Sequence, residues 1–193
     1  NDNDAVFCLD FEFDDFKNTN PISIGICSLN QKHQFYREFD FPDNYAQVND
    51  WVKENVIKHL QNNQKPLNEV FENLNRFLSD FSGKNIYLIS DHNIDVSIME
   101  KLKPQFSFPV TVMTIELYVY SYATQIYKHL DLKKDENYAK FEVTNSNILK
   151  SLEEYEDYFK THNIIQHHAL NDTVVMATLL ERGINEKDNN RDI

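Results

Sequence analysis

Two acidic side chains near the start of the chain are spaced so that both can bind one cation. Asp10 and Glu12 lie at the end of an expected strand, Ala5 to Phe11. Apolar residues on both alternating faces of this stretch predict a strand that is covered on both sides. Residues two apart in a strand point to the same face, and neighbouring buried carboxylates repel each other unless a cation lies between them. Alternatively the strand simply reaches solvent here, because acidic pairs with this spacing also occur elsewhere, as at Glu38 and Asp40.

A second polar group lies near the end of the chain, where the segment 167–172 (HHALND) leads into an apolar helix. Five positions of an α-helix correspond to a rotation of about 140°, so His167 and Asp172 would diverge if both were helical. They can share a site only if His167 lies in the preceding loop and folds back over the helix start. The alternative is a helix cap at Asn171 or Asp172 and an exposed imidazole at His167.

Two further carboxylates lie around an expected strand-to-helix junction between Ile86 and Met99. Either Asp91 or Asp95 can reach the strand end that carries Asp10. Asp95 lies beside apolar residues that would anchor the helix, whereas Asp91 is also suited to capping the turn. Capping or solvation is the alternative for each of them.

The order of the expected elements predicts an α/β fold with a mixed sheet and helices on its faces. Three strands with short connections come first, and helices then alternate with strands. The expected strands are Ala5 to Phe11, Pro21 to Leu29, His33 to Phe39, Ile86 to Ile89 and Val110 to Met113, and the expected helices start near Trp51 and cover Leu67 to Phe81, Ile94 to Leu102, Glu116 to Lys128, Asn147 to Phe159 and Leu170 to Arg182. Gly183 is expected to end the last helix, which gives one domain over 1–183 and a polar tail over 184–193.

Composition limits the classes of function. The 193 residues, 41% of them apolar, are enough for one compact core, and a formal charge of −12 argues against a broad basic surface for duplex nucleic acid. No apolar run is long enough to span a membrane and no signal peptide is evident, so a cytoplasmic protein is expected. Cys8 and Cys27 lie in apolar stretches without metal-ligand spacing, which predicts buried reduced thiols.

Taken together, these polar groups resemble one known arrangement. Asp10-Phe11-Glu12, then Asp95, then His167-x-Ala-x-x-Asp172 is similar, in order and interval, to the motifs of the DEDDh family of 3′–5′ exonucleases over almost the whole chain. The resemblance implies the ribonuclease H-like fold, with a five-stranded sheet of three antiparallel strands followed by parallel ones. The segments 10–15 (DFEFDD), 22–26 (ISIGI) and 51–56 (WVKENV) narrow the resemblance to small bacterial exoribonucleases that act on RNA 3′ ends.

The resemblance also implies a role for each residue. Asp10 would bridge two divalent cations, Mg²⁺ or Mn²⁺, Glu12 and Asp172 would hold the ion that carries the attacking water, and Asp95 would support the other ion through a water. His167 would accept the proton of the attacking water as general base. A site made of oxygen donors suits Mg²⁺ or Mn²⁺ better than it suits Zn²⁺. Homodimers are common among related exonucleases, although nothing in the sequence identifies a self-complementary surface.

Some assignments stay open at the level of the sequence. Ile94 stands where the family usually has an aromatic residue before its aspartate, so Asp91 is a second candidate for the role given to Asp95. His168 adjoins the expected base, although the family spacing selects His167. Phe13 and Trp51 are candidates to contact the substrate, with core packing as the alternative for both.

The expected activity is hydrolysis of single-stranded nucleic acid, preferably RNA, from its 3′ end to nucleoside 5′-monophosphates. A DNA 3′–5′ exonuclease of proofreading or phage type would carry the same site residues. A catalytically silent ribonuclease H-like module that only binds nucleic acid or protein is the alternative from another class.

Overall fold

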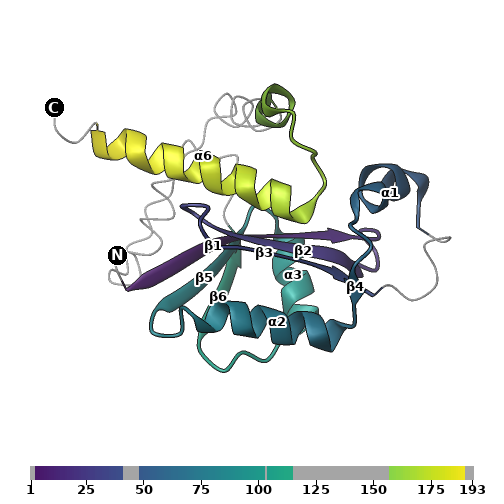
Figure 1. The fold of residues 1–193 in the computed structure, drawn as a ribbon, viewed down its shortest axis with the longest axis horizontal. Coiled ribbons are helices and arrows are strands. Elements are labelled where there is room, and N and C mark those ends of the chain that lie inside the picture. Colours follow the sequence, from purple (N-terminus) through teal and green to yellow (C-terminus); the bar gives the residue numbers. More distant parts are fainter. Residues whose placement is uncertain (1–2, 41–47, 103, 115–156, 190–193) are drawn as a thin grey trace.

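One mixed β-sheet forms the centre of the molecule, which we describe from a computed structural model covering residues 3–40, 48–102, 104–114 and 157–189, the last eight of these by their backbone alone. Its strand order is β4-β3-β2-β1-β5-β6 (Figure 1). The strands are β1 (Asp4–Phe13), β2 (Pro21–Ser28), β3 (Gln34–Phe39), β4 (Gln64–Lys65), β5 (Asn85–Ser90) and β6 (Val110–Thr114). The helices are α1 (Asp50–Asn55), the 3-10 helix η2 (Ile57–His59), α2 (Leu67–Ser79), α3 (Asn93–Leu102) and α6 (Ala169–Asn189), and residues 157–162 are also helical.

The predicted α/β class and mixed sheet are confirmed. Strands β1, β2 and β3 form an antiparallel meander, while β5 and β6 run parallel to β1. The predicted number of five strands is wrong, because β4 adds a sixth strand parallel to β3. Buried Glu38 explains this addition: its carboxylate accepts hydrogen bonds from the backbone N–H groups of Gln61 and Asn63 and draws the segment 61–65 against the edge of the sheet.

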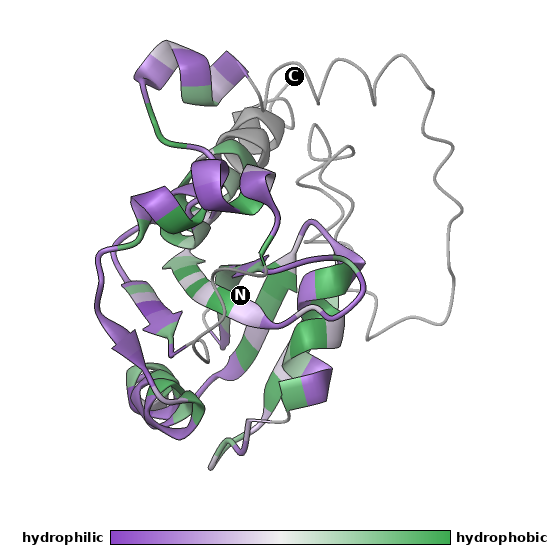
Figure 2. Ribbon diagram, turned by 90° about the vertical axis from the view of Figure 1, so that its right-hand side faces the viewer, coloured by the Kyte–Doolittle hydropathy of each residue, from purple (hydrophilic) through white to green (hydrophobic). Residues whose placement is uncertain are grey.

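Helices cover both faces of the sheet. Figure 1 shows α6 lying across one face and α2 across the other, and Figure 2 shows hydrophobic residues concentrated on the strands and on the adjoining sides of the helices. The alternation of β1 explains the two layers. Phe7 and Leu9 pack with residues of α2 and α3, whereas Cys8 packs with residues of α6 such as Met176. Asp10 and Glu12 continue the series of Cys8 on the α6 side of the sheet.

The two cysteines are buried, free and aligned as cross-strand partners, as the sequence analysis expected of reduced thiols. Cys8 on β1 lies opposite Cys27 on β2, beneath α6. Burial raises the pKa of both thiols, so they remain protonated and act as small apolar side chains of the core.

The last helix differs from its predicted end. It continues through Gly183 to Asn189, so the predicted stop at Gly183 is wrong. A glycine inside a helix costs only about 1 kcal/mol relative to alanine, which favourable neighbours can offset. The expected helix Glu116 to Lys128 and most of Asn147 to Phe159 lie outside the described residues. In the part that is described, no helix has both the length and the apolar composition needed to cross a bilayer.

Candidate metal centre

A pocket of about 530 Å³ opens where the carboxyl ends of β1 and β5 meet the starts of α3 and α6. Strands β1 and β5 are parallel, so their last residues lie at the same edge of the sheet, where open α/β sheets usually bind ligands. The pocket is lined by all five polar residues expected at the site, Asp10, Glu12, Asp95, His167 and Asp172, and by Asp91. The fold therefore brings together residues that are up to 162 positions apart in the sequence.

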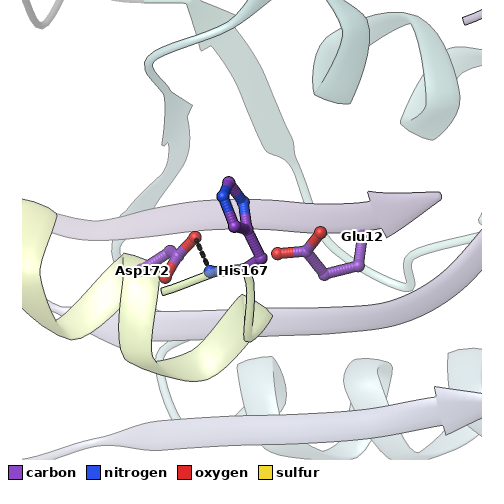
Figure 3. A group of neighbouring side chains, drawn as sticks. All are labelled: Glu12, His167 and Asp172. Carbon is purple, nitrogen blue, oxygen red and sulfur yellow. Dashed lines mark hydrogen bonds between the residues drawn. The ribbon is translucent and has the colours of Figure 1, made fainter. Parts of the chain in front are cut away.

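The first group of potential metal ligands consists of Glu12, His167 and Asp172. One ligand atom of each lies within 4.8 Å of the others. Figure 3 shows the Glu12 carboxylate pointing toward His167, with Asp172 on the other side of that residue. This group combines two carboxylates with one imidazole, which are the side chains needed to hold a cation and to accept a proton beside it.

His167 lies before the helix, as the sequence analysis required for a shared site. Helix α6 begins at Ala169, and His167 adopts the left-handed backbone conformation with φ of 60°. Its backbone N–H donates a hydrogen bond of 3.2 Å to Oδ2 of Asp172 (Figure 3). The loop thus folds back over the first turn of the helix. The hydrogen bond from its backbone also lets Asp172 fix the position of His167 in the site.

Gly25 allows α6 to start directly against the sheet. It lies opposite Asp10 in the pairing of β1 and β2. A Cβ atom at this position would lie 2.2 Å from the backbone C and O of Ala169, closer than any real contact. Hydrogen is therefore the only side chain that permits this approach, which holds the first turn of α6 above Asp10.

Replacing Gly25 with alanine is expected to lower the free energy of unfolding by about 1–3 kcal/mol, because the added methyl group must push α6 away. Metal binding should weaken in the same variant, since Asp172 moves with the helix. Chemical unfolding and manganese titration measure the two effects. Gly83→Ala is the matched control, because an added Cβ there meets no atom within 4 Å. Equal losses in both variants would contradict this role of Gly25.

The second group of potential ligands consists of Asp10, Asp91 and Asp95, again with one oxygen of each within 4.8 Å of the others. Asp95 is 2% exposed and joins α3 to the strands. Its Oδ1 accepts a hydrogen bond of 3.2 Å from the backbone N–H of Phe11, and its Oδ2 accepts one of 2.5 Å from the hydroxyl of Ser90. The sequence analysis left a choice between Asp91 and Asp95, and the structure brings both to the site.

The carboxylates of the site have no positively charged partner among the residues that the structure describes. The ion pairs found among the described residues, Lys53 with Asp50 and Lys65 with Glu69, do not involve them. Oδ2 of Asp10 and Oδ1 of Asp172 are buried and accept no hydrogen bond from the described protein groups. Unpartnered buried carboxylate oxygens are costly, so their presence in a pocket favours a bound cation.

The pKa values of these groups reflect the same crowding. Burial, followed by repulsion from Asp95, Glu12, Asp172 and Asp91, raises the pKa of Asp10 well above its ordinary value. Burial raises the pKa of Asp95 to about 7 and that of Asp172 to about 8, and it also raises the pKa of Glu12 and of Asp91. Hard oxygen donors with this excess of negative charge fit Mg²⁺ or Mn²⁺.

This crowding predicts an unusual pH dependence for the metal-free protein. Asp95 and Asp172 have folded-state pKa values above the ordinary 3.8, so between about pH 4 and 7–8 the folded state holds protons that the unfolded state has released. The free energy of unfolding should therefore fall as the pH rises through this range, by at most roughly 1.4 kcal/mol per pH unit for each group.

Urea unfolding in chelator at pH 5.5 and at pH 8 measures this dependence. Asp172→Asn should show a shallower slope, because one of the titrating groups is gone. Manganese should remove the loss of stability at pH 8 by binding the ionised carboxylates. Equal stability of the metal-free protein at the two pH values would contradict the crowding.

The two histidines of the loop face different surroundings. His167 lines the pocket, and its ring forms a T-shaped pair with Trp51, with 4.9 Å between the ring centroids. The His168 ring instead stacks on Tyr36, with 4.5 Å between centroids, outside the residues that line the pocket. Burial, reinforced by His59, lowers the pKa of His167, which keeps its imidazole neutral. The geometry therefore favours His167 over His168 as a proton acceptor.

Trp51 and Phe13 both line the pocket. Trp51 is 54% exposed, and its helix is attached to the sheet by buried Val52 and Val56. Trp51 is therefore not a core residue, and the alternative of core packing does not hold for it. Phe13 is half-buried, and its ring forms a T-shaped pair with that of Phe16, with 5.4 Å between the ring centroids.

Phe16 is a pocket residue that the sequence analysis missed. Its side chain is 79% exposed and lines the pocket, and the loop that carries it contains several hydrogen bonds. Asp14, for example, accepts hydrogen bonds from the backbone N–H groups of Asp15 and Asn20. A phenylalanine directly after an acidic loop was the only available signal, and among 14 phenylalanines it could not be distinguished from a core residue.

Comparison with known proteins adds no assignment: no protein-family model matches the chain, and no curated protein matches its sequence. Any statement about function therefore depends on the geometry of the pocket and on the sequence motifs that it unites.

Proposed function

We propose that this protein is a metal-dependent 3′–5′ exonuclease with a ribonuclease H-like fold that hydrolyses single-stranded nucleic acid, preferably RNA, to nucleoside 5′-monophosphates. The observation that carries the proposal is the pairing of two acidic groups in one pocket, Glu12–His167–Asp172 and Asp10–Asp91–Asp95. Two adjacent groups of oxygen ligands with one imidazole fit hydrolysis of a phosphodiester better than binding alone.

Each residue of the site has a separate role in the proposed hydrolysis. When bound, two divalent cations stabilise the attacking oxygen and the departing 3′ oxygen of an in-line displacement. Glu12 and Asp172 would hold the ion on the side at which water attacks. Asp10, a member of the other group, lies near enough to feel the charge of carboxylates from both groups and would contact both ions. His167, kept neutral by burial, accepts the proton of the water as its oxygen bonds to phosphorus and the bond to the 3′ oxygen breaks.

Aromatic residues at the pocket support a single-stranded substrate. Phe13, Phe16 and Trp51 present ring surfaces beside the acidic groups, and bases stack on aromatic side chains without regard to sequence. The net charge of −12 offers little attraction to a long duplex, so a short unpaired end is the better fit. The preference for RNA rests on the segments that resemble small exoribonucleases, of which Trp51–Val56 is the most distinctive.

The proposal is tested with 5′-labelled RNA and DNA oligomers of one sequence, incubated with Mn²⁺ or with chelator. We expect products shortened one nucleotide at a time from the 3′ end, release of nucleoside 5′-monophosphates, and a faster rate on RNA. A circular RNA of the same length is the control, because it offers no end. Cleavage of the circle would contradict an exonuclease, and a faster rate on DNA would contradict the RNA preference. No cleavage of any oligomer would contradict the proposal as a whole.

A further inference from the structure

We propose that Asp91 is a direct ligand of the cation at the Asp10 side of the site and acts together with Asp95, so that five carboxylates hold the two ions. This inference rests on the proposed function and concerns the same pocket. The resemblance assigns one aspartate from this part of the chain to the site. The positions of both residues in the sheet argue for two.

The register of the sheet places Asp91 beside Asp10. Strand β5 is parallel to β1, with Ile89 aligned to Cys8. If this alignment is continued for two residues along each chain, Asp91 falls beside Asp10, on the side of the sheet that Cys8 faces. Asp91 lies one residue beyond the end of β5, and one of its carboxylate oxygens lies within 4.8 Å of oxygens of Asp10 and Asp95. The parallel pairing of the strands therefore directs a second carboxylate to the position of the ion.

Asp95 is already engaged in holding the fold together. Both of its oxygens accept hydrogen bonds, from Phe11 on β1 and from Ser90 on β5. These bonds orient the side chain and use part of its capacity to accept, which is about four lone pairs in a carboxylate. Asp95 thus links α3 to both strands, and Asp91 supplies a further oxygen at the position where the strands end.

Unpartnered oxygens of residues that line the pocket point independently to a cation. Oδ2 of Asp10 is buried without a hydrogen-bond partner among the described residues. Asp172, which is 7% exposed and lines the same pocket, has an unpartnered Oδ1. Three carboxylates on the Asp10 side, against two and a neutral imidazole on the other, supply enough negative charge to hold an ion there before any nucleic acid binds.

Calorimetric titration of the protein with Mn²⁺ at pH 8, without nucleic acid, tests the assignment. The wild type is expected to bind two ions. Asp91→Asn should weaken one of them at least about tenfold, because even residues that only contact a ligand change affinity by 10–100-fold. Asp15→Asn is the matched control: it removes the same charge from the wall of the same pocket, outside both ligand groups, and should change neither affinity more than about threefold.

Stability in chelator separates a ligand from a structural residue. Asp91→Asn should keep or increase the unfolding temperature of the metal-free protein, because repulsion is removed. Asp95→Asn should lower it, because the bonds to Phe11 and Ser90 are weakened. Two ions bound to Asp91→Asn with wild-type affinity would overturn the role of Asp91 and leave the proposed function standing. A wild type that binds no manganese would overturn both.

Discussion

Replacing Asp10 with asparagine is expected to reduce hydrolysis by about a thousandfold or more, the largest effect of any single change in the protein. Asp10 belongs to one ligand group, and carboxylates of both groups contribute to its raised pKa, in the order Asp95, Glu12, Asp172 and Asp91 after burial. Asparagine keeps the shape of the side chain but removes the charge that a cation requires. Single-turnover hydrolysis of labelled RNA at saturating Mn²⁺ measures the loss.

The same variant should be more stable than the wild type when metal is absent. At pH 8 in chelator, Asp10→Asn removes one of several like charges held together without a compensating cation. Thermal unfolding should therefore occur at a higher temperature in the variant, while added manganese should stabilise it less than it stabilises the wild type.

Asp4→Asn is the control for Asp10→Asn, because it makes the same change at the opposite end of β1. Oδ1 of Asp4 accepts a hydrogen bond from the side chain of Asn85, far from the pocket. This variant should hydrolyse RNA at the wild-type rate. Wild-type turnover by Asp10→Asn would contradict the metal site, and a loss of the folded state would show instead that Asp10 is needed for structure.

The second large effect is expected from His167→Asn, which should lower the rate about 10²–10⁴-fold by removing the general base. Asparagine suits this position because it tolerates the left-handed conformation that His167 adopts. The backbone N–H that donates to Asp172 is retained as well. The Michaelis constant should change much less than the turnover rate, since the carboxylates stay in place.

The pH dependence of hydrolysis provides the specific signature of His167. Burial and His59 lower the pKa of His167. As the pH is lowered, the wild-type rate should therefore stay constant until the pH is below the ordinary histidine pKa of 6.5, and then fall as the ring is protonated. In His167→Asn this decline should disappear. Saturating manganese in both measurements keeps the carboxylates ionised, which leaves the imidazole as the titrating group.

Two other histidines serve as comparisons. His33→Asn changes a ring that packs on Phe81, away from the pocket, and should leave the rate and its pH dependence unchanged. His168→Asn breaks the stack on Tyr36 and should have a smaller effect than His167→Asn. A larger effect at His168, with loss of the pH dependence there, would transfer the role of base to that residue.

Much of the fold could be predicted because its main elements are locally encoded. The apolar run before Asp10 predicted β1, and the helical spacing between Leu67 and Phe81 predicted α2, which ends at Ser79. Strand β4 could not be found in this way. It has only two residues, and it exists because buried Glu38 binds the backbone of a segment more than 20 positions away.

The composition of the site followed from the sequence, but its assembly did not. Position at a strand end or helix start, together with the resemblance to the DEDDh motifs, made Asp10, Glu12, His167 and Asp172 the candidates. His167 does lie before the helix, as a shared site required. The sequence could not decide between Asp91 and Asp95. Whether either carboxylate comes close to Asp10 depends on how β5 pairs with β1.

The sequence by itself led us to expect a metal-dependent site, since carboxylates at strand ends and an imidazole before a helix are local features of the chain. The tertiary structure decided which carboxylates face one pocket, and how closely. Gly25 illustrates the reason: its missing side chain lets α6 meet the sheet, and a contact between residues 144 positions apart leaves no local pattern. Crowded, unpartnered carboxylates arise only from such long-range contacts, and they are what makes a cation the expected occupant of the site.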